Sequence, residues 1–297
     1  MKPLVLFSPW FGPWPSWINL YLVSCAANPE VGWVIPTDQA PPECRPDNVR
    51  FLQMTFAEFA GKVAETVGMP FAPGNFYKVV DVKPMLGHVF EAETQGYRSW
   101  GFADIDVIFG NIRRFYDDAT LERYAAISTH ANMLGGHFAV FRNSAKMRTA
   151  YRRRPRRWRE AVASPHAVAF DERGFGALFK SRKPLQRLFA IRPALFVERF
   201  STVDGGPEWE ARGPQFPSTW LWKDGTLRTR EGGDREFLYL HFMNWRSQRY
   251  RSFGRAPWPE LGTNPVRIGW REAERNGFAI SPLGFTSLDS VTSAEDV

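Results

Sequence analysis

Two aspartates one residue apart, Asp104 and Asp106, stand inside an apolar stretch that runs from Trp100 to Gly110. Burying an unpaired carboxylate is costly, and strand alternation would place both side chains on one face, where their like charges repel. A divalent cation relieves that repulsion, and Mg²⁺ and Mn²⁺ prefer carboxylate and phosphate oxygens. The spacing therefore indicates a metal that holds a diphosphate. A turn in which both aspartates cap backbone amides is the alternative interpretation.

Asp38 and Lys83 are candidates for contact with a nucleotide. Asp38 follows a strand expected over residues 32–36, and parallel sheets bind ligands at the carboxyl ends of their strands. Its alternative role is to cap the following turn. Lys83 begins a helix expected over residues 83–95, where its charge opposes the helix dipole and a bound anion would relieve the conflict. The alternative is that Lys83 and the nearby Lys78 are solvated.

Three further side chains have residue types suited to chemistry. Asp171 and Glu172 open another expected helix, and either could be the general base for an acceptor hydroxyl or could simply stabilise the first helical turn. His241 ends an expected strand over residues 236–242. An imidazole is a common third ligand beside two carboxylates, and a hydrogen-bonded core histidine is the alternative. His137 is interpreted as hydrogen-bonded structure.

The elements that would position these residues alternate along the first third of the chain. Helices are expected over residues 16–27 and 55–68, the second opened by a capping box at Thr55 and Glu58 and ended by Gly68. A hairpin is expected around Asp224-Gly225. Strands are expected over residues 3–8, 32–36, 49–54, 98–106, 126–129, 137–142, 192–199 and 236–242. This order predicts an α/β fold with a mixed, mostly parallel central sheet flanked by helices, with C-terminal β-hairpin additions.

Composition narrows the class of protein. The chain has 297 residues, a net charge of +7 and 15% aromatic residues. The positive charge leads us to expect anionic ligands. The two cysteines suggest a reducing cytosol, and no apolar window is long enough for a membrane span. Neither a Rossmann glycine fingerprint nor a P-loop is present, which disfavours NAD and ATP chemistry. We expect one domain over residues 1–285, with a nucleotide-binding part to about 143, an acceptor-side part from about 144, and a flexible tail over 286–297.

A strongly basic segment runs from Lys146 to Arg159. It is interpreted first as a solvated helical face broken at Pro155. It could also dock on an anionic membrane leaflet or a lipid-linked phosphate, or bind a nucleic-acid backbone. The rival to an enzyme is thus a non-catalytic basic protein that binds anionic membrane or nucleic acid through this segment.

Several strings together are more specific than Asp-x-Asp alone. They are Ser8-Pro-Trp-Phe-Gly12, Asn75-Phe-Tyr-Lys78, Asp81-Val-Lys-Pro84, Gly96-Tyr97 followed by Trp100-Gly101, Asp104-Ile-Asp106, Gly136-His-Phe138, and Leu240-His-Phe242. With this set, the sequence resembles an uncharacterised bacterial glycosyltransferase-like family whose members often occur with polysaccharide genes. The resemblance covers roughly residues 3–246.

The resemblance implies a GT-A-like nucleotide-diphospho-sugar transferase fold. It implies that Asp104 meets the ribose or sugar, that Asp106 holds Mn²⁺ or Mg²⁺, and that His241 is an extra ligand. Ser8 falls among the nucleotide-binding positions. Related folds place Gly and Lys after such a histidine, whereas Asn244, Trp245 and Arg246 follow here, and Arg246 could face a phosphate.

The expected function is therefore metal-dependent transfer of a sugar, hexosyltransferase-like, from a nucleotide sugar to a hydroxyl on a glycan or lipid-linked acceptor. Surface polysaccharide or lipopolysaccharide synthesis is the expected setting. Lys83 and Arg246 would stabilise the departing phosphate. The expected location is cytoplasmic, with peripheral contact at the inner face of the cell membrane, and no nucleic-acid partner is expected.

Overall fold

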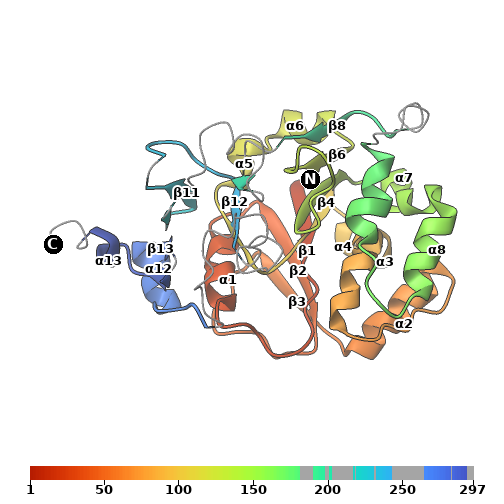
Figure 1. Cartoon of the computed structure of the whole chain (residues 1–297), viewed down its shortest axis with the longest axis horizontal. Coiled ribbons are helices and arrows are strands. Elements are labelled where there is room, and N and C mark those ends of the chain that lie inside the picture. The colour runs from red at the N-terminus through yellow and green to blue at the C-terminus, as the bar shows by residue number, and fades with distance from the viewer. Residues whose placement is uncertain are drawn as a thin grey trace, which may run out of the picture.

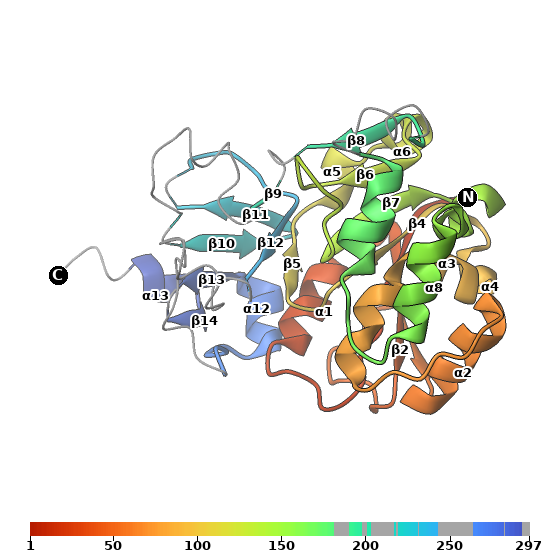
Figure 2. The ribbon, with the colours of Figure 1, turned by 45° about the vertical axis from the view of Figure 1, so that its right-hand side comes forward.

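The structure, a computed structural model, describes residues 1–180, 190–197, 201–202, 217, 219–230, 232–242, 264–281 and 283–292. A larger α/β body carries the first two thirds of the chain, and a smaller, mainly β unit lies beside it (Figures 1 and 2). Helix α1 (Ile18–Ala26) and strand β5 (Val107–Phe109) lie where the two parts meet.

The central sheet has seven strands in the order β3-β2-β1-β4-β7-β6-β8. Four of its six strand pairings are parallel, and the two that involve β7 are antiparallel. The strands are β1 (Lys2–Phe7), β2 (Val31–Thr37), β3 (Val49–Gln53), β4 (Tyr97–Ala103), β6 (Ala126–Ser128), β7 (Phe138–Arg142) and β8 (Ala194–Phe196). The predicted mixed, mostly parallel sheet is confirmed.

Each face of the sheet packs against its own hydrophobic core. Along β1, Leu4 and Leu6 join the core on the side of α1, whereas Val5 and Phe7 join the opposite core, as the two-residue strand period requires. The opposite core is covered by α2 (Phe56–Val67) and the elements that follow it. Helix α2 has the predicted capping box at Thr55 and the predicted left-handed end at Gly68.

The smaller unit contains two short sheets. One pairs β5 with β12 (Tyr239–His241) and β12 with β9 (Ser201–Thr202). The other has the order β11-β10-β13-β14, and its strands are β10 (Trp220–Lys223), β11 (Thr226–Thr229), β13 (Phe278–Ser281) and β14 (Gly284–Thr286). The predicted hairpin is confirmed, because Asp224 and Gly225, with φ 49 and φ 74 degrees, form the turn between β10 and β11. Positive φ at both central residues is what a tight two-residue hairpin turn requires.

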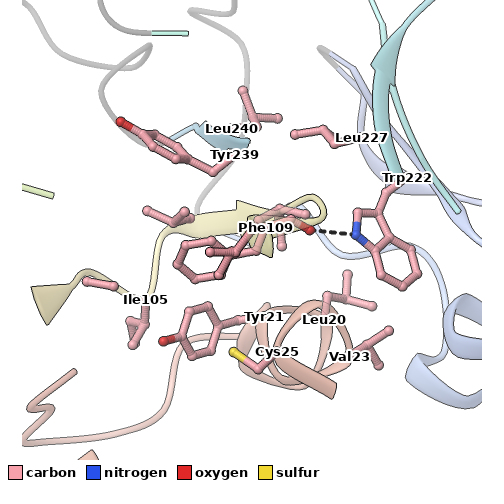
Figure 3. Close-up of a cluster of buried hydrophobic side chains, with 14 of the residues drawn as sticks. Leu20, Tyr21, Val23, Cys25, Ile105, Phe109, Trp222, Leu227, Tyr239 and Leu240 are labelled. Atoms are coloured by element: carbon pink, nitrogen blue, oxygen red, sulfur yellow. Dashed lines mark hydrogen bonds between the residues drawn. The ribbon is translucent and has the colours of Figure 1, made fainter. Parts of the chain in front are cut away.

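Trp222 joins this hairpin to the larger body. Its indole Nε1 donates to the carbonyl oxygen of Phe109 at 2.8 Å, and the hairpin then packs over the same apolar cluster as α1 and β12 (Figure 3). Further helices are α5 (Ile112–Phe115), α6 (Asp118–Arg123), α12 (Trp270–Asn276) and α13 (Asp289–Thr292). In the described part of the chain, no helix is both long and apolar enough to cross a bilayer.

The continuous helix expected over residues 83–95 does not form, although much of this segment is helical. The chain instead forms a 3₁₀ helix η1 (Phe76–Met85) and two short helices, α3 (Leu86–Val89) and α4 (Glu91–Thr94). Pro84 lies near the end of η1, where its missing N–H prevents a regular α-helix from running through this segment. Lys83 therefore lies in the last turn of a helix instead of the first. The helix-dipole argument for an anion beside it fails for that reason.

Three other expectations are refined. Pro155 breaks the basic segment as predicted, giving α7 (Ala145–Arg148), η2 (Ala150–Arg153) and α8 (Pro155–Ala163), and it sits in the first turn of α8, where proline is tolerated. The helix expected at Asp171 is a π-helical turn, η3 (Phe170–Phe175), followed by η4 (Gly176–Leu178). In the expected tail, residues 289–292 form α13, and residues 293–297 lie outside the described part.

Candidate active site

The Asp104–Asp106 loop is fixed by contacts from three distant parts of the chain. β4 ends at Ala103, so the two aspartates lie in the bend that follows it and not on one face of the strand. The amide of Asp104 donates to the carbonyl of His137 at 2.9 Å, and the amide of Phe242 donates to the carbonyl of Asp106 at 3.2 Å. The indole of Trp17 donates to the carbonyl of Ile105 at 2.9 Å. These bonds therefore fix the backbone that carries both carboxylates.

Lys83 forms a buried ion pair with the first aspartate. Its Nζ lies 2.5 Å from Asp104 Oδ1 and 2.8 Å from the carbonyl oxygen of Gly136. Burial alone would lower the pKa of Lys83, but the carboxylates of Asp104, Asp171 and Asp106 outweigh it and raise that pKa. Lys83 is therefore a fixed positive charge at this end of the site. The alternative of a solvated Lys83, or of a solvated Lys78, is wrong because both side chains are buried.

Asp106 is paired with His241 through strand pairing. β5 and β12 run antiparallel with His241 opposite Val107, which places His241 Nε2 3.3 Å from Asp106 Oδ2. Burial would raise the pKa of Asp106, yet His241 and Lys83 outweigh it and lower that pKa. The other oxygen of this carboxylate, Oδ1, is buried without a hydrogen-bond partner among the described residues.

His137 supports the His241 ring instead of facing a ligand, as interpreted from the sequence. The two rings stack with centroids 4.3 Å apart and planes 14° apart. His137 Nε2 lies 2.6 Å from the hydroxyl of Tyr239, which also bonds the hydroxyl of Thr129. Burial, and then the charges of His241 and Lys83, lower the pKa of His137 well below its usual value. Its ring is therefore neutral at neutral pH.

Asp171 and Glu172 lie close to Gly136, beside the Lys83–Asp104 pair. A Cβ built on Gly136 would lie 2.7 Å from Glu172 Oε1 and 2.9 Å from Asp171 Oδ2, so both carboxylates lie over the glycine whose carbonyl holds Lys83. Burial raises the pKa of Asp171 to about 7, with Glu172 and Asp104 adding to the rise and Lys83 opposing it. Asp171 is thus poised to exchange a proton near neutral pH.

A second buried ion pair anchors the segment that leads to Asp171. Lys78 and Asp81 are fully buried, and Lys78 Nζ bonds Asp81 Oδ2 at 2.7 Å, the carbonyl of Ala161 at 2.6 Å and the carbonyl of His166 at 2.8 Å. The Asp81 carboxylate also accepts the amides of Val168 at 2.9 Å and Phe170 at 2.7 Å. These bonds fix the turn immediately before Asp171.

Three of these charged side chains, Lys83, Asp104 and Asp106, line a pocket of about 480 Å³. The loops that follow β1 and β4 build it, so it lies at the carboxyl ends of these neighbouring parallel strands, where ligands bind in such sheets. Lys83, Asp104 and Asp106 supply the charge. Aromatic side chains supply much of the remaining wall: Trp10, Phe11, Trp17, Phe76 and Tyr77.

The aromatic wall was not predicted from the sequence, although Trp10 and Phe11 lie within one of the strings that carry the resemblance. Its position directly after the first strand of a parallel sheet was the available signal. Phe11 packs on Phe56 and Phe59 with ring centroids 5.0 and 5.2 Å away, so α2 holds this wall in place.

The remaining predicted site residues lie elsewhere. Asp38 is exposed, and its Oδ1 accepts the amide of Gly12 at 2.9 Å, so it fixes the loop that carries Trp10 and Phe11. The Ser8 hydroxyl is buried and bonds the hydroxyl of Tyr21 at 2.9 Å; a direct nucleotide contact would require that bond to open. Arg246 lies outside the described residues.

Asp106 and His241 have the chemistry of a partial divalent-metal site. Within the described ranges no group of three His, Cys, Asp or Glu side chains forms a preformed metal cage, since Asp104 Oδ1 is engaged by Lys83. Mg²⁺ characteristically uses one or two protein ligands plus substrate phosphates. Asp106 Oδ2 and His241 Nε2 lie 3.3 Å apart, so a single small cation could contact both. The buried, unbonded Asp106 Oδ1 also fits a cation.

Comparisons with solved structures give partial overlaps. An active-site mutant of LgtC matches over 65% of this chain and 86% of its own, with 12% identity and a TM-score of 0.36. The galactosyltransferase LgtC in complex with donor and acceptor sugar analogues matches over 71% and 92%, with 11% identity and a TM-score of 0.34. The glycosyltransferase GlyE of Streptococcus pneumoniae TIGR4 matches over 92% of this chain but 60% of its own, with 13% identity and a TM-score of 0.42.

No curated protein matches the sequence. One family model, described as a family of unknown function (DUF6625), matches residues 6–259, which is most of the chain. The chain therefore belongs to this family of unknown function.

Proposed function

We propose that this protein is a metal-dependent glycosyltransferase of the GT-A-like type that moves a sugar from a nucleotide-diphosphate donor to a hydroxyl acceptor. One observation carries the proposal: a pocket with an aromatic wall is also lined by Lys83, Asp104 and Asp106, and these side chains form the Lys83–Asp104 pair and, with His241 behind the pocket lining, the Asp106–His241 pair. An aromatic wall suits a base or a sugar ring, and the charged side chains suit a diphosphate with its cation.

Asp106 and His241 would hold Mn²⁺ or Mg²⁺, with the diphosphate as a further ligand. When bound, the ion would neutralise the charge that develops on the departing nucleotide diphosphate. Stacking of His137 on His241 and its bond to Tyr239 keep the His241 ring in position. The ligand directions would therefore be set before the donor arrives.

Lys83 and Asp104 would orient the donor. Lys83 uses two N–H groups on Asp104 and Gly136, and an ammonium group has three donors, so one can reach a phosphate oxygen. The Asp104 side chain is 35% exposed, which allows its second oxygen to accept a sugar or ribose hydroxyl. A phosphate contact by Arg246 stays a prediction.

Asp171 would be the base that accepts the proton of the acceptor hydroxyl. With a pKa raised to about 7 by burial, it can be deprotonated before the reaction and protonated by it near neutral pH. Glu172, beside it over Gly136, adds negative charge that favours proton uptake. A base acting directly on the acceptor would favour inversion at the anomeric carbon.

A thermal-shift panel of nucleoside diphosphates and nucleotide sugars, each with and without Mn²⁺, tests the proposal. We expect one nucleotide to raise the melting temperature only when Mn²⁺ is present, and Asp106→Asn to abolish that rise. Asp118→Asn, on an exposed aspartate paired with Arg113, is the matched control and should keep it. The proposal would be refuted if no nucleotide gave an Mn²⁺-dependent rise in melting temperature. Product analysis of an active protein should also detect the transferred sugar.

The alternative hypothesis, a non-catalytic basic protein, predicts salt-sensitive binding to DNA or anionic vesicles and no nucleotide response. The described structure already engages part of the basic segment internally: Arg148 pairs with Glu91, and Arg156 with Glu160. A role in surface polysaccharide or lipopolysaccharide synthesis and a cytoplasmic location stay predictions from the resemblance.

A further inference from the structure

Exposed hydrophobic side chains lie on the pocket wall and on a loop bonded to the same segment. Among the residues whose side chains the structure describes, five large hydrophobic side chains are exposed, and three of them lie on two adjoining segments: Phe76, Tyr77 and Val168. Tyr77 is 71% exposed and Val168 49%. Scattered single hydrophobics on a surface need no explanation, but a cluster beside a binding site indicates an interaction surface.

The cluster is held rigidly. Phe76 and Tyr77 begin η1, and Val168 lies on the loop after α8. The amide of Gly74 donates to the carbonyl of Pro165 at 2.9 Å, and the buried Lys78–Asp81 pair ties η1 to the same loop. The hydrophobic side chains are therefore presented to solvent by a well-bonded support, and local unfolding does not explain their exposure.

A strongly positive stretch lies directly before this loop. Six arginines fall between residues 152 and 159 with no acidic residue among them, and α8 carries the last three. Arg156 and Arg157 share one acidic partner, Glu160, at 2.8 and 3.7 Å, so positive charge remains in excess. Helix α8 packs on η1 through the bond from Lys78 to the carbonyl of Ala161, and its end continues into the loop (Figure 2).

We propose that Phe76, Tyr77 and Val168, together with the arginines of η2 and α8, dock the protein on an anionic lipid leaflet. Stable peripheral binding requires two signals. One is a set of aromatic and aliphatic side chains that enter the interface, and the other is a set of basic residues that attract anionic headgroups. Docking brings this wall of the pocket to the leaflet. The acceptor hydroxyl then belongs to a membrane-embedded lipid or glycolipid, and this last step alone rests on the proposed glycosyl transfer.

Co-sedimentation with vesicles tests the docking. We expect the full chain to bind phosphatidylcholine vesicles that contain phosphatidylglycerol, and to bind pure phosphatidylcholine far more weakly. Arg156→Gln and Arg157→Gln should each weaken binding about fivefold, and rising salt should weaken it further. Val168→Ser should weaken it roughly fivefold because one aliphatic side chain no longer enters the interface. Leu283→Ser, on an exposed leucine that does not line the pocket, is the matched control and should change nothing.

The docking proposal would be overturned if Val168→Ser left vesicle binding unchanged and the protein bound DNA as tightly as anionic vesicles. The arginines would then be a general polyanion site. Absent binding to anionic vesicles would overturn the docking proposal as well. Val168 does not line the pocket, so Val168→Ser should keep the Mn²⁺-dependent nucleotide response. Vesicle binding without any nucleotide response would refute the glycosyltransferase proposal and leave the docking intact.

Discussion

Replacing Lys78 by methionine tests whether the buried pair with Asp81 supports the whole acidic side of the site. Both side chains are completely buried, and the change would leave the Asp81 carboxylate without its counter-charge. Breaking such a pair typically costs about 3–5 kcal/mol. The amides of Val168 and Phe170 still donate to Asp81. We therefore expect a loss near the lower limit, about 3 kcal/mol in the free energy of unfolding.

Urea denaturation followed by tryptophan fluorescence and circular dichroism measures this loss. For a chain of this size, about 3 kcal/mol corresponds to a fall of roughly 5 °C in the melting temperature. The double variant Lys78→Met with Asp81→Asn should recover part of the loss, because it leaves no unpaired charge and the asparagine oxygen can still accept one amide.

Arg156→Met is the control for this experiment, because Arg156 pairs with Glu160 at an exposed position and surface pairs contribute little. A loss below about 1 kcal/mol for Lys78→Met would refute the reasoning, as would an equal loss for Arg156→Met. The first result would mean that the Asp81 charge is compensated by its two amide donors alone.

Three further predictions concern the site itself. Burial raises the pKa of Asp171 to about 7, so the folded protein holds a proton that the unfolded chain releases near about pH 4. The free energy of unfolding should therefore fall as pH rises from about 4 to about 7, by at most about 4 kcal/mol. Urea denaturation at about pH 5 and about pH 8 measures this fall, which should be smaller in Asp171→Asn. Gly136→Ala would place a Cβ 2.7 Å from Glu172 Oε1. That change should cost about 1–3 kcal/mol in unfolding free energy together with most of the activity, and unchanged stability and turnover would contradict the contact. His241→Ala should remove the Mn²⁺-dependent part of nucleotide binding in calorimetry, and retention of a full metal effect would exclude His241 as a ligand.

Local sequence signals predicted the elements that depend on neighbouring residues. The Thr55–Glu58 capping box, the stop at Gly68 and the Asp224-Gly225 turn all occur as predicted, because their bonds close within a few residues. The mostly parallel sheet followed from the order of strands and helices.

The errors arise where distant contacts override local preference. Residues 83–95 have a helical apolar pattern, yet Pro84 interrupts it, and Lys78 and Lys83 of η1 are held by acceptors as far along the chain as His166 and Gly136. The sequence drew attention to Asp104, Asp106 and His241 separately. That Lys83 occupies one oxygen of Asp104, and that β12 places His241 beside Asp106, depends on pairings that no local pattern encodes.

The pairing of β5 with β12 also has a consequence for how the protein is made. The hydrogen-bonded side chains of His137 and Tyr239 are separated by 102 positions in the sequence. Because a ribosome adds only on the order of ten amino acids each second, the synthesis of the two is separated by roughly ten seconds. Over that interval the nascent chain carries the acidic loop and an unpaired edge of β5 with no imidazole from β12 beside them. The central sheet can assemble early, whereas the proposed cation site is complete only when the later strand has emerged from the ribosome and paired with that edge.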